Sequence, residues 1–250
     1  MRPPSSVRID DTLWRAERTM ARRRLRHLPV LDAGQLVGAV SERDVLVERA
    51  RLRATTRDHD WWFASVRAVM HEAPPTATPD DPPNFASDRL AESPEAILAV
   101  VERGFLVGIV TATDLLDSEL RSWASDAVVT AADVMTEAPV TITPRDSLLE
   151  AARMMSDHQI RYLPVVEHGA VVGLLCDHNL LLKENPRRWS VRDVMCCPIA
   201  PVEQGTTLAD LSRVLIDARL GAVPVVDDEQ RLVGVVAYVD VLRTLANQFD

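Results

Sequence analysis

Apolar and polar positions between residues 140 and 155 follow two different periods in succession. Val140–Thr143 alternates apolar and polar side chains and is rich in β-branched residues, which predicts a short strand before Pro144. Ser147, with Glu150 three residues later, has the pattern of a capping box and predicts the start of a helix. The apolar residues of that helix fall on one face at Leu148, Ala151, Ala152 and Met155.

The residues that follow predict a strand hairpin and a second helix. Tyr162–Val166 and Val171–Leu175 are apolar runs separated by a polar turn at 167–170, which is the pattern of two antiparallel strands. A helical segment is expected from Asp177 to Leu182. The predicted unit is β-α-β-β-α, so the expected fold class is α/β (α+β).

The hairpin pattern occurs four times along the chain. Leu28-Pro-Val30 in the first copy is matched by Leu163-Pro-Val165 in the third and by Val223-Pro-Val225 in the fourth, and Ile97–Val100 gives a weaker second copy. Each copy continues with an apolar pair and a glycine, at Gly38, Gly108, Gly173 and Gly234. The spacing between consecutive glycines of this set is too long for a solenoid repeat and suits a small αβ unit.

The last three copies each open with a Val-Met pair. The pairs are Val69-Met70, Val134-Met135 and Val194-Met195, and 38 or 39 residues separate each Met from the glycine of its copy. A unit of about 60 residues buries too little apolar surface alone, so we expect the units to pair through their sheets. The predicted domains are 1–125, with motifs at about 1–50 and 66–122, and 126–250, with motifs at about 130–185 and 190–246.

Composition narrows the class of protein. The chain has 28 Lys and Arg against 37 Asp and Glu, a net charge of -9, which disfavours non-specific binding of nucleic acid. We expect no membrane span and no signal peptide, and therefore a cytoplasmic protein. The three cysteines form no CxxC pair and the histidines have no metal-type spacing, so no metal site is expected.

The repeated sequences resemble the CBS domain, the family named for cystathionine beta-synthase. The resemblance rests on the leading Val-Met, the Leu-Pro-Val-Val and Leu-Val-Gly segments, and Gly108-Ile-Val-Thr-Ala-Thr-Asp114, and it covers nearly the whole chain. It is weaker in copy two, where Pro82, Pro83 and Pro94 are expected to disturb the helix and Ala99 replaces the usual proline. It implies tandem motifs paired into two pseudo-twofold modules that bind adenine nucleotides as regulatory ligands and do not catalyse reactions.

Clefts of that family that hold adenosine compounds carry a glycine, an apolar residue, a hydroxyl residue and, three positions after the hydroxyl, an aspartate. Copy one matches with Ser41 and Asp44, and copy two matches with Thr111 and Asp114. The carboxylate can accept both ribose hydroxyls, and the hydroxyl and helix N-terminus can meet phosphate. The nucleotide site (AMP, ADP or ATP) is therefore expected in the first pair.

Three further residues of copy one are candidates for contact with phosphate. Arg43 precedes Asp44, and Arg26 and His27 flank the start of the Leu-Pro segment. Copies three and four depart from the pattern, with Cys176 and Asn179 in one and Ala237 before Asp240 in the other. Because these residues cannot reproduce the hydroxyl and carboxylate pair, the second pair is expected to be structural or divergent.

Alternatives remain at each of these features. Ser/Thr-x-x-Asp at a strand-to-helix turn is also a helix cap that needs no ligand. The chain could be a ligand-free scaffold that docks an effector protein or another copy of itself. The resemblance also implies a homodimer formed through the CBS pairs, or a single chain whose two pairs make the same assembly. Nucleic-acid binding is a weaker alternative, resting on a basic stripe expected on the first helix and on the aromatic run Trp61–Phe63. The stripe comprises Arg15, Arg18, Arg22 and Arg26. No arrangement of nucleophile and base is found, so no catalytic activity or catalytic cofactor is expected.

Overall fold

Copy one is built around an antiparallel hairpin with one helix before it and one after it. Its elements are β1 (Val7–Arg8), α1 (Leu13–Arg23), β2 (His27–Asp32), β3 (Gln35–Ser41) and α2 (Glu42–Thr55). The turn between β2 and β3 passes through Ala33 and Gly34, both with positive φ, so that the two strands can reverse within two residues. This is the predicted β-α-β-β-α order.

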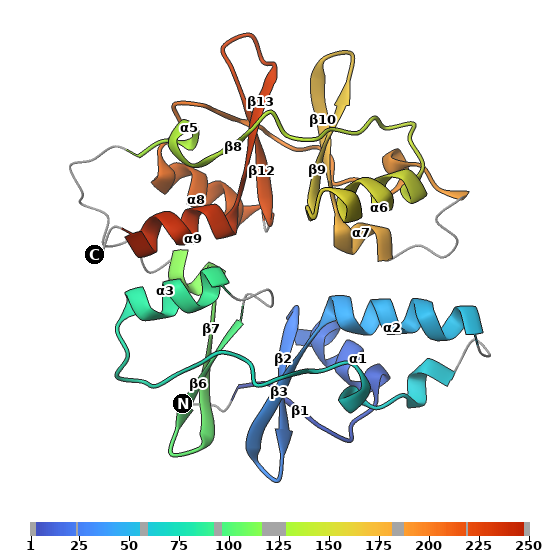
Figure 1. Cartoon of the computed structure of the whole chain (residues 1–250), viewed down its shortest axis with the longest axis vertical. Coiled ribbons are helices and arrows are strands. Elements are labelled where there is room, and N and C mark those ends of the chain that lie inside the picture. The colour runs from blue at the N-terminus through green and yellow to red at the C-terminus, as the bar shows by residue number, and fades with distance from the viewer. Residues whose placement is uncertain are drawn as a thin grey trace. The chain divides into compact units, whose positions relative to one another are not determined.

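The computed structural model describes residues 4–23, 25–55, 60–92, 97–116, 129–181, 188–218 and 220–247. The chain divides into two compact units, residues 1–115 and residues 116–248. In Figure 1 the first unit runs from blue to green and the second from yellow-green to red. Each unit contains two copies of the repeat.

Copy two has the same β-α-β-β-α elements, preceded by an entry segment. It comprises the 3-10 turns η1 (Asp60–Phe63) and η2 (Val66–Ala68), β4 (His71–Glu72), β5 (Thr76–Ala77), α3 (Pro83–Glu92), β6 (Ile97–Glu102) and β7 (Phe105–Thr111), followed by helical residues 112–116. The expectation that Pro82 and Pro83 disturb the helix is wrong. Pro83 begins α3, and proline is favoured at the first helical position because that residue needs no N–H partner. Pro94 lies outside the described residues.

The sheet of the first unit joins the two copies. Its strand order is β1-β2-β3-β7-β6-β5, with β4 paired to β3. β4 belongs to copy two but lies antiparallel to β3 of copy one, with Ala39 opposite His71 and Gly38 opposite Glu72. The entry segment of one repeat therefore completes the sheet of the other.

Copy three confirms the predicted helix start and hairpin. It contains α5 (Ala131–Val134), β8 (Thr136–Glu137), α6 (Leu148–Asp157), β9 (Tyr162–Glu167), β10 (Ala170–Cys176) and α7 (Asp177–Leu181). The Ser147 side chain accepts a hydrogen bond from the Glu150 N–H at 3.1 Å, which satisfies a free donor of the first turn of α6. The strand expected at Val140–Thr143 is reduced to a single parallel bridge between Ile142 and Val165.

In the second unit the entry segment of each copy pairs with the hairpin of the other copy. The elements of copy four are η4 (Val191–Asp193), β11 (Val202–Glu203), α8 (Leu208–Asp217), β12 (Ala222–Val226), β13 (Leu232–Ala237) and α9 (Tyr238–Asn247). The entry strand β8 of copy three pairs with β13 of copy four. Cys196, at the entry of copy four, forms an antiparallel bridge with Leu174 of copy three.

The first helix buries apolar residues on one face. In α1 the buried residues are Leu13, Ala16 and Met20, at helical spacing. Trp61, in η1, is 3% exposed and belongs to the core of the first unit, whereas Phe63 is 78% exposed. The aromatic run is thus divided between core and surface.

The four arginines of the predicted basic stripe do not all lie on one helix. α1 ends at Arg23, so Arg26 lies beyond the helix and before β2. Arg18 instead lies over the ring of Trp14, 4.9 Å from its centroid. Arg15 forms an ion pair with Asp11. Since part of this charge is engaged locally, the stripe gives little support to nucleic-acid binding.

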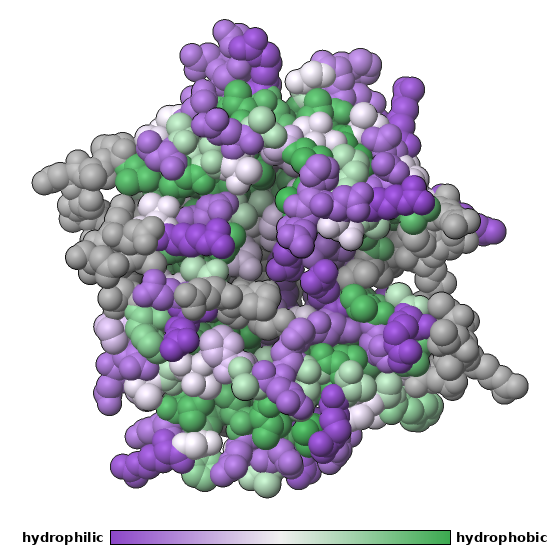
Figure 2. Space-filling model, viewed as in Figure 1, coloured by the Kyte–Doolittle hydropathy of each residue, from purple (hydrophilic) through white to green (hydrophobic). Residues whose placement is uncertain are grey.

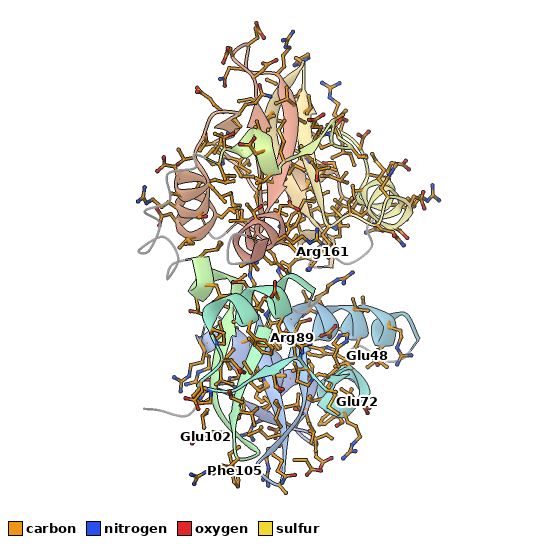
Figure 3. The ribbon with its side chains drawn as sticks, turned by 60° about the vertical axis from the view of Figure 1, so that its left-hand side comes forward. Glu48, Glu72, Arg89, Glu102, Phe105 and Arg161 are labelled. Carbon is orange, nitrogen blue, oxygen red and sulfur yellow. The ribbon has the colours of Figure 1, made fainter. Side chains whose placement is uncertain are left out.

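The tips of the hairpins are mostly polar, except that Phe105 at the β6–β7 turn is an exposed aromatic residue. The hydrophilic tip between β12 and β13 is visible in Figure 2, and there Asp227 accepts hydrogen bonds from both the backbone and the side chain of Arg231. Glu102 and Phe105, at the β6–β7 turn, are labelled in Figure 3. Among the described residues no helix is long and apolar enough to cross a membrane.

Candidate functional site

Ser41 and Asp44 meet where β3 passes into α2. Oδ2 of Asp44 accepts hydrogen bonds from the backbone N–H of Ser41 at 2.8 Å and from its hydroxyl at 2.6 Å. The Asp44 N–H in turn lies 3.2 Å from the Ser41 Oγ. This reciprocal pattern caps α2, so the expected cap geometry is present.

The other copy-one candidates lie at the same end of the hairpin. His27, the first residue of β2, is directly opposite Ser41 in the strand register. The carbonyl of Arg26 accepts a hydrogen bond from the N–H of Glu42 at 2.8 Å, which places Arg26 beside the first residue of α2. Arg43 is exposed on the first turn of α2. The sequence-predicted residues of copy one are therefore gathered around one strand-to-helix junction.

The structure adds His71 to this junction. Its Nε2 lies 3.1 Å from Oδ1 of Asp44. His71 reaches this position because β4 pairs with β3, and its side chain remains 49% exposed. Sequence reasoning missed it, although its place directly after the Val69-Met70 pair marks the start of an entry segment.

Copy two reproduces the cap at the end of β7. Oδ2 of Asp114 accepts from the Thr111 N–H at 2.9 Å and from the Thr111 hydroxyl at 2.6 Å. Thr111 lies opposite Ile97 in the strand register, as Ser41 lies opposite His27. The two predicted hydroxyl and carboxylate pairs therefore have the same local geometry.

A shallow apolar hollow lies between the two copies of the first unit. It has about 160 Å³ of empty space, part of it open to solvent, and is lined by Pro29, Leu36, Gly38, Ala39, Pro74, Ile97 and Ala99. Ala39 is two residues before Ser41, and Ile97 is the strand partner of Thr111, so the hollow extends toward both junctions. It is too shallow to enclose a nucleotide in this conformation.

The corresponding junctions of the second unit are different. In copy three the Cys176 thiol donates to Oδ1 of Asn179, and the Cys176 N–H lies 3.4 Å from the same oxygen. In copy four, the Ala237 N–H donates to Asp240 at 2.8 Å, and Ala237 has no side-chain hydroxyl or thiol to add a second hydrogen bond. Burial raises the pKa of Asp240, against the opposing effects of the Ala237 N–H and Arg243.

An aromatic side chain occupies the space between the strands of the second unit. The hydroxyl of Tyr162 packs against Gly221 of copy four so closely that a Cβ at Gly221 would collide with it. Burial and the neighbouring Tyr238 raise the pKa of Tyr162. Arg161, labelled in Figure 3, forms an ion pair with Asp177 at 3.0 Å. These contacts fill the region that corresponds to the Arg26 and His27 region of copy one.

No metal centre accompanies either unit within the part of the chain that the structure describes. There, no group of three or more His, Cys, Asp or Glu side chains is placed to hold a metal ion. Cys176, Cys196 and Cys197 are present as thiols. The junctions of the first unit present carboxylates, hydroxyls and basic side chains.

The chain is a tandem-repeat α/β protein in which four repeats of the β-α-β-β-α pattern form two paired modules, and in each module an entry segment of one copy pairs with the hairpin of the other. The sequence signature of the CBS domain matches residues 1–51, 66–121, 131–184 and 191–247. The chain belongs to the CBS domain family, and the resemblance expected from its repeats is confirmed.

Relatives that match over most of the chain have the same architecture. Protein MJ1225 of Methanocaldococcus jannaschii is 24% identical over 261 residues, which cover 94% of this chain and 92% of that protein. Its crystal structure superposes with a TM-score of 0.82, covering 98% of this chain and 96% of that one. A conserved protein of Pyrococcus horikoshii gives a TM-score of 0.67 at 19% identity, with the same shares of the two chains.

A shorter relative matches part of the chain. The CBS domain-containing protein YhcV of Bacillus subtilis is 30% identical over 112 residues, which cover 43% of this chain and 79% of YhcV.

The family match and the solved structures together confirm the expected fold class.

Proposed function

We propose that this protein is a regulatory sensor that binds an adenosine nucleotide (AMP, ADP or ATP) in its first CBS pair. The observation that carries the proposal is the occurrence of the same hydroxyl and carboxylate pair at both junctions of the first unit, Ser41 with Asp44 and Thr111 with Asp114. Neither junction of the second unit has such a pair. The proposed functional modules are residues 1–125 and 126–250.

The carboxylates would bind the ribose. In both caps only Oδ2 takes the hydrogen bonds from Ser41 or Thr111, so Oδ1 can accept from a sugar hydroxyl without loss of the helix cap. At Asp44 the Oδ1 contact is with the half-exposed His71, which can turn away into solvent. Ribose binding would thus replace one surface contact.

The phosphates would lie toward the basic residues of copy one. Arg26, His27 and Arg43 lie around the N-terminal end of α2, a helix of 14 residues. Cationic side chains and the free N–H groups of a helix start both stabilise phosphate. The base would enter the apolar hollow between the copies, which has room for a flat ring only after the lining strands move apart.

The need for the strands that line the hollow to move apart suggests how nucleotide binding would produce a signal. A ligand shifts a conformational equilibrium only if it binds one state better than the other. A nucleotide that needs a wider hollow between copies one and two would favour a state in which β4 and β3 lie farther apart. An effector protein or a second copy of this chain that contacts the first unit would then detect the change.

A ligand-free scaffold is the second candidate, and the structure offers one observation in its favour. Both oxygens of Asp44 already have protein partners, Ser41 and His71, and the hollow is shallow. If the protein is a scaffold, the two caps of the first unit would only stabilise the starts of their helices. Under either proposal the protein acts by binding and not by catalysis.

Calorimetric titration with AMP, ADP and ATP separates the two candidates. The sensor predicts micromolar binding that is lost in an Asp44→Asn/Asp114→Asn variant, in which each amide oxygen can still cap its helix. The matched control is Asn179→Ala/Asp240→Asn in the second unit, which should bind as the wild type does. If none of the nucleotides gives a heat of binding with folded protein freed of co-purified ligand, the sensor proposal is wrong and the scaffold remains.

A further inference from the structure

Two of the three thiols converge on a single carboxamide in the second unit. The Cys176 Sγ donates a hydrogen bond to Oδ1 of Asn179, and the Cys196 Sγ lies 4.0 Å from that same oxygen. Cys176 ends β10 of copy three, whereas Cys196 lies in the entry segment of copy four. The two sulfur atoms are therefore brought together by the pairing of the repeats.

The strand register explains this proximity. Cys196 and Leu174 exchange both backbone hydrogen bonds, at 2.8 and 3.2 Å. Cys176 is two positions beyond Leu174, so its side chain leaves the sheet on the same face as that of Leu174. Residues in this diagonal relationship lie within reach of each other across neighbouring strands.

The same three positions in the first unit hold different chemistry. There Ser41, Asp44 and His71 form a hydroxyl, carboxylate and imidazole cluster. In the second unit the corresponding residues are Cys176, Asn179 and Cys196. The second unit thus has two thiols in place of the hydroxyl and the imidazole, and a neutral amide in place of the carboxylate. Such a combination is unsuited to a ribose and well suited to oxidation of two neighbouring sulfurs.

We propose that Cys176 and Cys196 form a reversible disulfide when the protein meets a peroxide. One thiolate attacks the peroxide, whose O–O bond breaks, and becomes a sulfenic acid with release of hydroxide or alkoxide. The second thiol then attacks the sulfenic sulfur, an S–S bond forms and water leaves. Two electrons pass from the thiols to the peroxide, and a dithiol reductant reverses the change.

The surroundings are compatible with this chemistry. Both cysteines are partly exposed, so a small peroxide can reach them. Turning the Cys176 Sγ away from Asn179 and toward Cys196 gives up one weak sulfur hydrogen bond. The resulting bond would join copies three and four covalently, so the second unit would respond to oxidants while the first responds to nucleotide.

The test uses the full-length reduced protein, treated with limiting hydrogen peroxide, alkylated and digested with trypsin without reduction. Cleavage after Lys183 and Arg192 places Cys176 in one peptide and Cys196 with Cys197 in another, so the bond appears as a linked pair of peptides. Fragmentation of the linked pair shows which of the adjacent cysteines is bonded. The proposal predicts loss of two of the three titratable thiols, with the bond at Cys196.

Variants give a second and independent comparison. Cys197→Ser should form the linked pair as the wild type does, and Cys196→Ser should not form it. A dithiol reductant should restore the thiols. A linked pair in Cys196→Ser at the wild-type level, a wild-type bond at Cys197, or oxidation to sulfinic acid without any linked pair would each overturn the proposal. The wild-type digest decides the matter even if a variant folds poorly.

Discussion

The imidazole of His71 and the carboxylate of Asp44 lie 3.1 Å apart although they belong to different repeats. The contact exists because the entry strand of copy two completes the sheet of copy one. It places a residue of one copy on the group that we propose for ribose binding in the other. Nucleotide binding at Asp44, as we propose it, would therefore be coupled to the contact between β4 of copy two and β3 of copy one.

Removal of His71 should improve binding at this junction. His71→Ala frees Oδ1 of Asp44, and because an exposed pair of this kind contributes about 0.2–1 kcal/mol, affinity for AMP should rise by a factor of roughly 1.4 to 5. Glu72→Ala, a change at the next exposed residue of the same strand, should leave affinity unchanged. Calorimetry measures both, and weaker binding by His71→Ala would instead make His71 a ligand contact.

The helix cap of copy two should contribute to stability without any ligand. Thr111→Ala removes the hydroxyl that bonds to Asp114 and should lower the free energy of unfolding by about 0.5–2 kcal/mol. Thr113→Ala, at an exposed position of the same helix, is the control. Urea unfolding of the nucleotide-free protein measures the difference, and equal losses in the two variants would contradict the cap.

The repeated glycines should tolerate a methyl group unequally. A Cβ at Gly38 would lie 2.9 Å from the carbonyl oxygen of His71, whereas a Cβ at Gly108 would meet only the Val100 side chain at 3.4 Å. We expect Gly38→Ala to destabilise the protein by about 1–3 kcal/mol through overpacking, and Gly108→Ala to have a much smaller effect. Chemical unfolding tests this, and the reverse order would mean that β4 does not lie on β3.

The buried carboxylate of copy four should make stability depend on pH. Burial raises the pKa of Asp240 in the folded protein, so the folded state holds this proton more tightly than the unfolded state. The contribution of the protonated group is present at low pH and is lost as pH rises through the folded-state pKa. Asp240→Asn, which stays neutral and keeps an oxygen for the Ala237 N–H, should therefore gain stability relative to wild type as the pH rises from about 4 through the folded-state pKa of Asp240.

Unfolding across that pH range measures the effect. Asp228→Asn, at an exposed turn of the same unit, controls for the loss of one negative charge. A constant difference between Asp240→Asn and wild type at every pH would contradict the assigned shift.

Local pattern was sufficient to predict the repeats, the hairpins and the caps. The start of α6 at Ser147 and the strands around Leu163-Pro-Val165 depend on residues that are close in sequence, so period and capping chemistry identify them. Pro83 was misjudged because the same residue can break a helix or begin one, and only its position decides which.

The contacts between repeats could not be predicted in the same way. Strands of two residues, such as β4, show no alternation, and their partners lie in another repeat. His71 was therefore missed at Asp44, and Cys196 was missed at Asn179. Two cues were present in the sequence: each residue directly follows a Val-Met pair, and each Met packs on the glycine of the other copy.

Comparison of AMP with 2′,3′-dideoxy-AMP tests whether the carboxylates of the first unit bind a ribose. In calorimetric titrations the wild type should prefer AMP, and this preference should disappear in Asp44→Asn/Asp114→Asn, because the variant lacks the charge that accepts the sugar hydroxyls. The second-unit variant Asn179→Ala/Asp240→Asn should keep the wild-type preference. Equal affinity of the wild type for both nucleotides, or a preference that survives in Asp44→Asn/Asp114→Asn, would contradict the account.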